Sequence, residues 1–159
     1  MKLVSEIVTE WLEKKKDEVR MSYESKGLKA SGRFGQSLAV DVVQNENKIT
    51  ARLTGNSYGY YMENGRGKTK GGGDGSLRSI IRQWIDDKGI VPHDKITKDS
   101  LSYLITRKIH EQGIKVPNAY NQGGVFSDVF TPKSIKDLAD QIGADYLKTV
   151  SSDIIKTFS

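Results

Sequence analysis

Hydrophobic side chains near the N-terminus recur at the spacing of an α-helix. The stripe is dense at first and thins toward Tyr23, while Glu and Lys fill the other face. Gly27 is a natural stop for such a helix. We therefore predict an amphipathic helix from Leu3 to about Ser25, followed by a flexible link over residues 28–36. The stripe consists of Leu3, Ile7, Trp11, Leu12, Val19 and Tyr23.

Two segments with alternating hydrophobic positions come next. Residues 37–43 and 48–54 place a hydrophobic side chain at every second position, which is the period of a β-strand. Residues 44–47 between them are polar and turn-forming. The pattern predicts a β-hairpin over 37–54 with one apolar face, and a long amphipathic helix is the usual cover for such a face. That face carries Leu38, Val40, Val42, Ile49, Ala51 and Leu53.

Helical periodicity returns in the second half of the chain. It predicts a helical insert over residues 76–112, in which Asp74 or Ser76 caps the first helix and the second helix spans 98–112. Thr131-Pro132 is a typical helix start, so a long final helix is expected from there.

The apolar residues at 125–130 are predicted to form a third strand or a docking edge. The expected fold is α+β and forms a single domain of residues 1–159. It has a small curved antiparallel sheet, made of the hairpin 37–54 plus one or two further strands. The N-terminal and C-terminal helices pack on this sheet.

Positive charge is concentrated in one stretch. The chain has 25 Lys and Arg against 20 Asp and Glu, a formal net charge of +5. Between residues 66 and 82, five cations face Asp74 alone. Such a patch suits a phosphate backbone or an acidic protein surface, and a solvated charged loop is the alternative. The cations are Arg66, Lys68, Lys70, Arg78 and Arg82.

Composition narrows the chemistry further. The chain contains no cysteine, which excludes disulfides and thiolate metal sites, and its two histidines argue against a His-rich site. Its first residues enter a charged helical pattern without the apolar segment of a signal peptide, and no run is long enough to span a bilayer. We expect the protein to be made and used in a cytoplasm.

The stretch GRGKTKGGGDGS at residues 65–76 contains Gly67-Lys68-Thr69, the last three letters of a phosphate-binding loop. That loop requires a glycine five positions before Gly67, because its backbone turns tightly around the phosphates, and Met62 stands there. Three glycines from Gly71 onward also interrupt the helix that should follow Thr69. The sequence therefore favours a mobile loop that becomes ordered on binding a partner.

A metal-dependent nuclease is a further alternative, with Asp41 and Glu46 holding Mg²⁺ and Lys48 near the attacking water. Glu46 falls in the predicted turn, where a solvated side chain is poorly held. His93 and His110 have no serine or carboxylate arrangement that resembles a triad. We predict a protein that is not an enzyme, with no metal and no cofactor.

The segment YGYYMENGRG and the hairpin before it resemble the tail-completion, or head–tail joining, proteins of tailed bacteriophages, of the lambdoid type. The family motif Tyr-x-x-Tyr-x-Glu-x-Gly is matched by Tyr58, Tyr61, Glu63 and Gly65. The helical insert, the Gly-Phe-Val stretch at 124–129 and the long final helix fit the same family. The Arg-Pro-Phe segment that often follows the motif is absent, and the glycine-rich basic loop stands in its place.

This resemblance implies a virion structural protein of the phage neck, made in the cytoplasm of a bacterial host. Copies of such a protein form a homo-oligomeric ring at the connector, between portal and tail proteins, and DNA passes through the ring. We expect the five cations named above to line the lumen, where they make non-specific contact with DNA, or to dock on the adjacent ring. No membrane contact is expected.

Tyrosine is enriched in interfaces, so Tyr58, Tyr60 and Tyr61, with Glu63, are predicted to contact a neighbouring subunit. The alternative is that the tyrosines cap the core of their own monomer. Three other functions stay open: a tail terminator or minor capsid protein of similar architecture, a small basic nucleic-acid-binding module outside the virion, and the nuclease.

Overall fold

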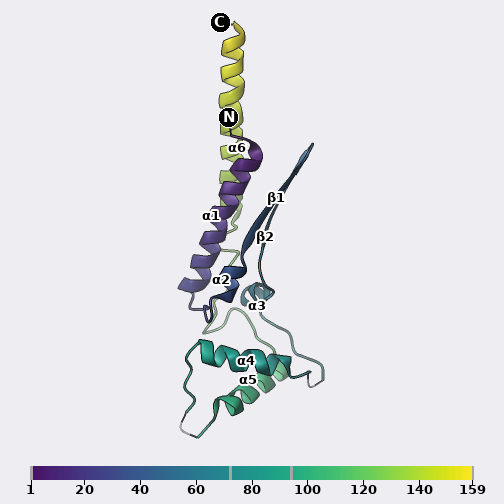
Figure 1. Ribbon diagram of the computed structural model, residues 1–159, viewed down its shortest axis with the longest axis vertical. Helices are drawn as coiled ribbons and strands as arrows, with labels where there is room; N and C mark the ends of the chain where they lie inside the picture. Colours follow the sequence, from purple (N-terminus) through teal and green to yellow (C-terminus); the bar gives the residue numbers. More distant parts are fainter. Residues whose placement is uncertain (1, 72, 94, 159) are drawn as a thin grey trace.

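The computed structural model describes residues 2–71, 73–93 and 95–158, and it confirms the α+β class. Helices and one antiparallel pair of strands form an elongated molecule (Figure 1). Helices α4 (Ser76–Asp87) and α5 (Lys98–Gln112) lie at one end of the long axis, and the C-terminal end of helix α6 (Pro132–Phe158) lies at the other. The predicted helical insert over 76–112 is confirmed as the α4–α5 pair.

Helix α1 (Val4–Ser25) forms where the hydrophobic stripe predicted it. The Glu6 carboxylate accepts a hydrogen bond from the Leu3 backbone N–H at 2.9 Å, which satisfies a donor that the helix itself cannot pair. Its apolar face lies against both strands of the hairpin, and its outer flank contacts α6 (Figure 1). Helix α1 therefore contacts both the hairpin and the C-terminal helix.

The predicted hairpin is confirmed as β1 (Ala39–Asn45) and β2 (Lys48–Thr54). Val40 lies opposite Leu53 and Val42 opposite Ala51, so the predicted apolar positions share one face. Leu38, just before β1, is buried, whereas the strand positions of that face are only half-buried or exposed. The helices thus cover the base of the hairpin far better than its tip.

The flexible link expected over residues 28–36 is wrong in its second half. Residues Arg33–Ser37 form the short helix α2, which places Phe34 in the core against Tyr23 at a ring-centroid distance of 5.1 Å. Residues Tyr58–Asn64 form helix α3, which adds Met62 to the same core. The core cluster consists of Val19, Tyr23, Phe34, Leu38, Met62, Val125 and Val129.

The third strand expected at 125–130 is wrong, and within the described residues the sheet has two strands. The segment forms consecutive turns instead. Its backbone N–H groups are used locally, because Asp128 N donates to Gly124 O and Phe130 N to Phe126 O. A backbone whose donors are satisfied in turns has none left for a sheet ladder. The hydrophobic side chains of this segment still reach the core through Val125 and Val129.

A backbone bridge closes the base of the α4–α5 pair. Arg66 N donates to Ile114 O at 2.8 Å and Ile114 N donates to Arg66 O at 2.7 Å. Side chains of α4 and its C-cap also join the pair to the body, because Asp87 pairs with Arg33 and Lys88 Nζ donates to Gly27 O.

The two capping predictions have different outcomes: Thr131 caps α6 as predicted, whereas Gly75, and neither Asp74 nor Ser76, occupies the N-cap position of α4. The Asp74 carboxylate accepts from Ser76 N at the start of α4, and Thr131 Oγ1 accepts from Ser134 N at the start of α6.

Candidate functional site

Helix α3 carries the tyrosine cluster on its solvent side. Tyr58, Tyr60 and Tyr61 are 42%, 66% and 44% exposed, and the rings of Tyr60 and Tyr61 meet edge to face with centroids 5.8 Å apart. Gly59 and Met62 occupy the buried side of the same helix. The tyrosines therefore lie outside the monomer's core, and their role as a subunit contact stays a prediction.

Glu63 behaves differently from its tyrosine neighbours. Its carboxylate is half-buried and accepts hydrogen bonds from Phe126 N at 3.0 Å and Ser127 N at 3.3 Å. This contact ties α3 to the turns that close the core. Because charged acceptors make stronger hydrogen bonds than neutral ones, Glu63 organises the fold within the monomer. Its contact with a neighbouring subunit stays a prediction, and its carboxylate already accepts two hydrogen bonds within the monomer.

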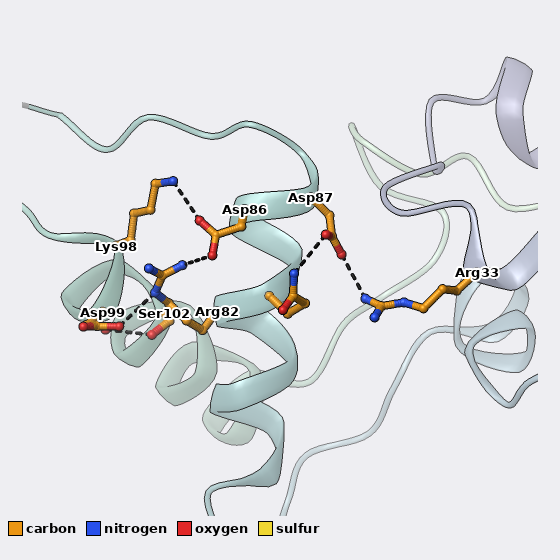
Figure 2. Close-up of polar contacts among 8 residues, drawn as sticks. Arg33, Arg82, Asp86, Asp87, Lys98, Asp99 and Ser102 are labelled. Atoms are coloured by element: carbon orange, nitrogen blue, oxygen red, sulfur yellow. Dashed lines mark hydrogen bonds and ion pairs between the residues drawn. The ribbon is translucent and has the colours of Figure 1, made fainter.

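Partial burial raises the pKa of the Tyr58 phenol. Tyr58 lines a cleft of about 460 Å³ that separates α4 from the connection between α1 and α2. Apolar side chains, among them Phe34 and Trp84, make up part of the lining. The Arg33–Asp87 ion pair at 2.9 Å joins α2 to α4 beside it (Figure 2). The cleft therefore marks a junction where α4 meets the body, lined in part by apolar side chains and bordered by this ion pair.

Arg66 is the first of the five predicted cations, and it faces inward. Besides its backbone bridge, its Nη2 donates to Thr69 Oγ1 at 3.2 Å, and its side chain is half-buried. Its Nη1 is buried, and the described residues supply it no hydrogen-bond partner. Arg66 thus packs the loop against α5.

Arg78 and Arg82 also have partners inside the molecule. Arg82 donates to the Asp99 carboxylate at 2.8 Å and also pairs with Asp86, which Lys98 contacts at 2.7 Å (Figure 2). The hydrogen bond from Lys98, then that from Arg82, holds the pKa of Asp86 below its ordinary value. The guanidinium of Arg78 lies 5.6 Å from the ring centroid of Tyr103. These contacts link α4 to α5 and leave Arg82 with little uncompensated charge.

Lys68, Lys70 and Arg78 are the predicted cations that stay exposed, and of these Arg78 contacts α5. Within the described residues, neither lysine belongs to an ion pair. The structure thus divides the predicted group of five into two solvent-facing lysines and three arginines that hold the insert together. Only the (i, i+4) spacing of Arg82 and Asp86 gave a sequence signal for this division.

The segment that contains these residues carries the whole charge excess of the chain. Residues 65–116 hold eleven Lys and Arg against six Asp and Glu, so their formal charge of +5 equals that of the complete sequence. The rest of the chain is neutral. In space, the segment forms the α4–α5 end of the elongated molecule (Figure 1). The net positive charge is therefore concentrated at one end.

The hairpin does not assemble the nuclease constellation. Asp41 lies opposite Arg52 across the strands, with 3.8 Å between Oδ2 and Nη1, and Glu46 is exposed in the turn. Arg52 was not in the predicted set, although its position opposite Asp41 follows from the hairpin register. A guanidinium beside Asp41 favours an ion pair over a metal ligand at that carboxylate.

Comparisons with protein-family models, with curated proteins and with solved structures found no match to this chain. In the part of the chain that the structure describes, no helix is long and apolar enough to cross a membrane.

Proposed function

We propose that this chain is a structural protein of the phage neck, whose copies form a ring around the path of the DNA. The observation that carries the proposal is the separation of surfaces along the molecule. All of the excess positive charge lies in residues 65–116, whereas the C-terminal half of α6 lies at the opposite end of the molecule. That half of α6 carries exposed apolar side chains, among them Leu147 and Ile154. The motif of Tyr58, Glu63 and Gly65 supplies the resemblance to the family.

Such a protomer suits a ring in which one end meets a polyanion and the other end meets protein. Exposed Lys68 and Lys70 lie on a loop whose sequence, from residue 65 to residue 75, contains six glycines. Lysines on such a loop neutralise phosphates without reading base edges. The contact is therefore sequence-independent and weakens with salt.

The first test is quantitative mass spectrometry of purified phage particles from a culture that produces this chain. A low, fixed number of copies per portal ring is the expected result. Particles that carry their other structural proteins but lack this chain would overturn the proposal.

The second test replaces Lys68 and Lys70 by serine. A matched control replaces Lys14 and Lys133, two exposed lysines outside the basic segment, and removes the same charge. We expect the loop variant to lower DNA retention in particles, while the control retains DNA as the wild type does. Equal retention in both variants would contradict the role of the loop.

A nucleic-acid-binding protein outside the virion is the second candidate, and the same charge separation favours it. It predicts that the free chain binds DNA with a strong salt dependence. The Lys68/Lys70 variant should then lower the slope of log K against log salt by about 1.8, at about 0.9 for each phosphate contact. Binding by the free chain, together with its absence from particles, would favour this candidate.

A further inference from the structure

The chain exposes far more surface than a compact protein of its size. Its accessible surface is 11078 Å², whereas a compact monomer of 17.7 kDa exposes about 8,000 Å². The surplus is about 3,000 Å². An obligate interface buries about 1,000–2,500 Å² on each partner. The surplus therefore corresponds to the surface that one subunit buries against two neighbours.

The C-terminal half of α6 supplies part of this surface. It extends beyond the N-terminal end of α1 (Figure 1). Leu147 is 65% exposed and Ile154 is 52% exposed. They are seven residues apart, so they lie on one side of the helix, and Val150 lies between them on the same side. This stripe of Leu147, Val150 and Ile154 has the length and spacing of a helix face that packs against another element.

The hairpin supplies a surface of complementary kind. Its apolar face carries Val42, Ile49 and Ala51 toward the tip, where side chains are half-buried or fully exposed. A two-stranded hairpin is marginally stable in water unless a further element covers it. Helix α1 covers the base, so the face near the tip lacks a complete cover in the monomer. A helix stripe is the ordinary cover for a sheet face.

Charge favours a second copy of the same chain as the partner. The hairpin carries Asp41 and Glu46 against Lys48 and Arg52, and residues 143–158 carry two Asp against two Lys. Both surfaces are therefore neutral, and two copies meet there without like-charge repulsion. The basic segment 65–116 lies at the other end, where two copies would repel each other.

We propose that the stripe of Leu147, Val150 and Ile154 docks on the apolar hairpin face of a second copy of this chain. Each copy uses one surface as donor and a different surface as acceptor, so the contact is head-to-tail. Closure of these contacts into a ring rests on the proposed neck function, whereas the contact itself does not. In a head-to-tail assembly, every subunit contacts one neighbour through its α6 stripe and the other neighbour through its hairpin face.

The test uses the full-length chain in sedimentation velocity over a range of concentrations. A stripe variant carries Leu147→Lys and Ile154→Lys, and a hairpin variant carries Ala51→Lys, at an exposed position of the apolar face. Matched controls place lysine off these surfaces. Ser152→Lys lies on another side of α6, and Val43→Lys lies on the opposite face of the hairpin. Near-ultraviolet circular dichroism establishes that each variant keeps the native fold.

The wild type and both controls should form concentration-dependent oligomers. Each variant alone should be monomeric, with its self-association weakened about 10- to 100-fold, since a buried charge replaces a buried side chain. Mixing the two variants provides the decisive result. Each retains the surface that the other lacks, so the mixture should form a 1:1 dimer that grows no further.

A wild type that stays monomeric, a folded variant that assembles like the wild type, or a mixture that stays monomeric would each overturn the proposal. These outcomes are distinguishable from failure of the neck function. If the variants assemble normally and the wild-type chain is found at the portal, the docking proposal alone is refuted. If the mixed variants form the 1:1 dimer but the chain is absent from particles, the proposed neck function alone is refuted.

Discussion

Replacing Gly65 by alanine tests how the helical insert is attached to the body. Gly65 has a φ of 77° and a ψ of −164°, a conformation that only glycine adopts readily. A Cβ on this residue would lie 2.2 Å from the carbonyl oxygen of Ile114. The change therefore strains the backbone and also forces apart the bridge between Arg66 and Ile114, next to Gly65.

The magnitude follows from these two effects. Backbone strain in a glycine-only region costs about 1–3 kcal/mol. Each of the two bridge hydrogen bonds contributes about 0.5–1.5 kcal/mol. The expected loss in the free energy of unfolding is about 2–6 kcal/mol. At about 2–4 °C per kcal/mol for a chain of this size, the thermal midpoint should fall by at least about 4 °C.

Gly67 provides the matched control, two residues along the same loop. A Cβ at Gly67 would meet nothing within 4 Å, and its φ lies outside the left-handed region. Gly67→Ala should therefore change stability by less than about 0.5 kcal/mol. Urea unfolding followed by circular dichroism measures both variants. Equal stabilities for Gly65→Ala and Gly67→Ala would refute the reasoning.

Two further predictions concern polar contacts. Glu63→Gln should lower the free energy of unfolding by about 1.5–3 kcal/mol, because an amide accepts less strongly from Phe126 N and Ser127 N than a carboxylate; a loss below about 0.5 kcal/mol in urea unfolding would argue against this. The lowered pKa of Asp86 means that its contacts with Lys98 and Arg82 stabilise the fold above the ordinary pKa of an aspartate and are lost as pH falls through the lowered folded value. Asp86→Asn should therefore lose part of the acid dependence of the thermal midpoint, and identical acid profiles in the variant and the wild type would contradict the prediction.

Several predictions that rested on local sequence patterns agree with the structure. The stripe that predicted the first helix, the cap at Thr131 and the alternation in the hairpin all depend on residues close together in the sequence. Such patterns are readable because the periods of helix and strand differ. Gly143 lies within α6 and does not end it, since a single glycine costs only about 1 kcal/mol in a helix.

The predicted third strand failed for a non-local reason. Residues 125–130 have the hydrophobic content of a strand, but the Glu63 carboxylate, more than sixty residues earlier, accepts two of their N–H groups. Local turn hydrogen bonds satisfy other donors of the segment. Hydrophobic content alone does not distinguish a strand from a turn that delivers side chains to a core.

The division of the basic residues had the same cause. Sequence proximity grouped Arg66, Lys68, Lys70, Arg78 and Arg82 as one candidate surface. Contacts with distant residues decide which of these cations have partners within the fold. Arg82 pairs with Asp99, seventeen residues later, and the backbone of Arg66 pairs with that of Ile114, beyond the whole insert. Burial and pairing depend on which segments meet in space, and a list of charges along the chain does not contain that information.

The sequence by itself determined the α+β class, the hairpin and its apolar face, the helical insert, and the concentration of positive charge between residues 65 and 116. Each of these follows from composition or from a period within one segment. Tertiary structure alone decided that three arginines hold the insert in place, that Lys68 and Lys70 face solvent, and that the stripe on α6 and the hairpin tip lack a full cover. The physical reason is that exposure and pairing are properties of contacts between distant segments, which the fold creates.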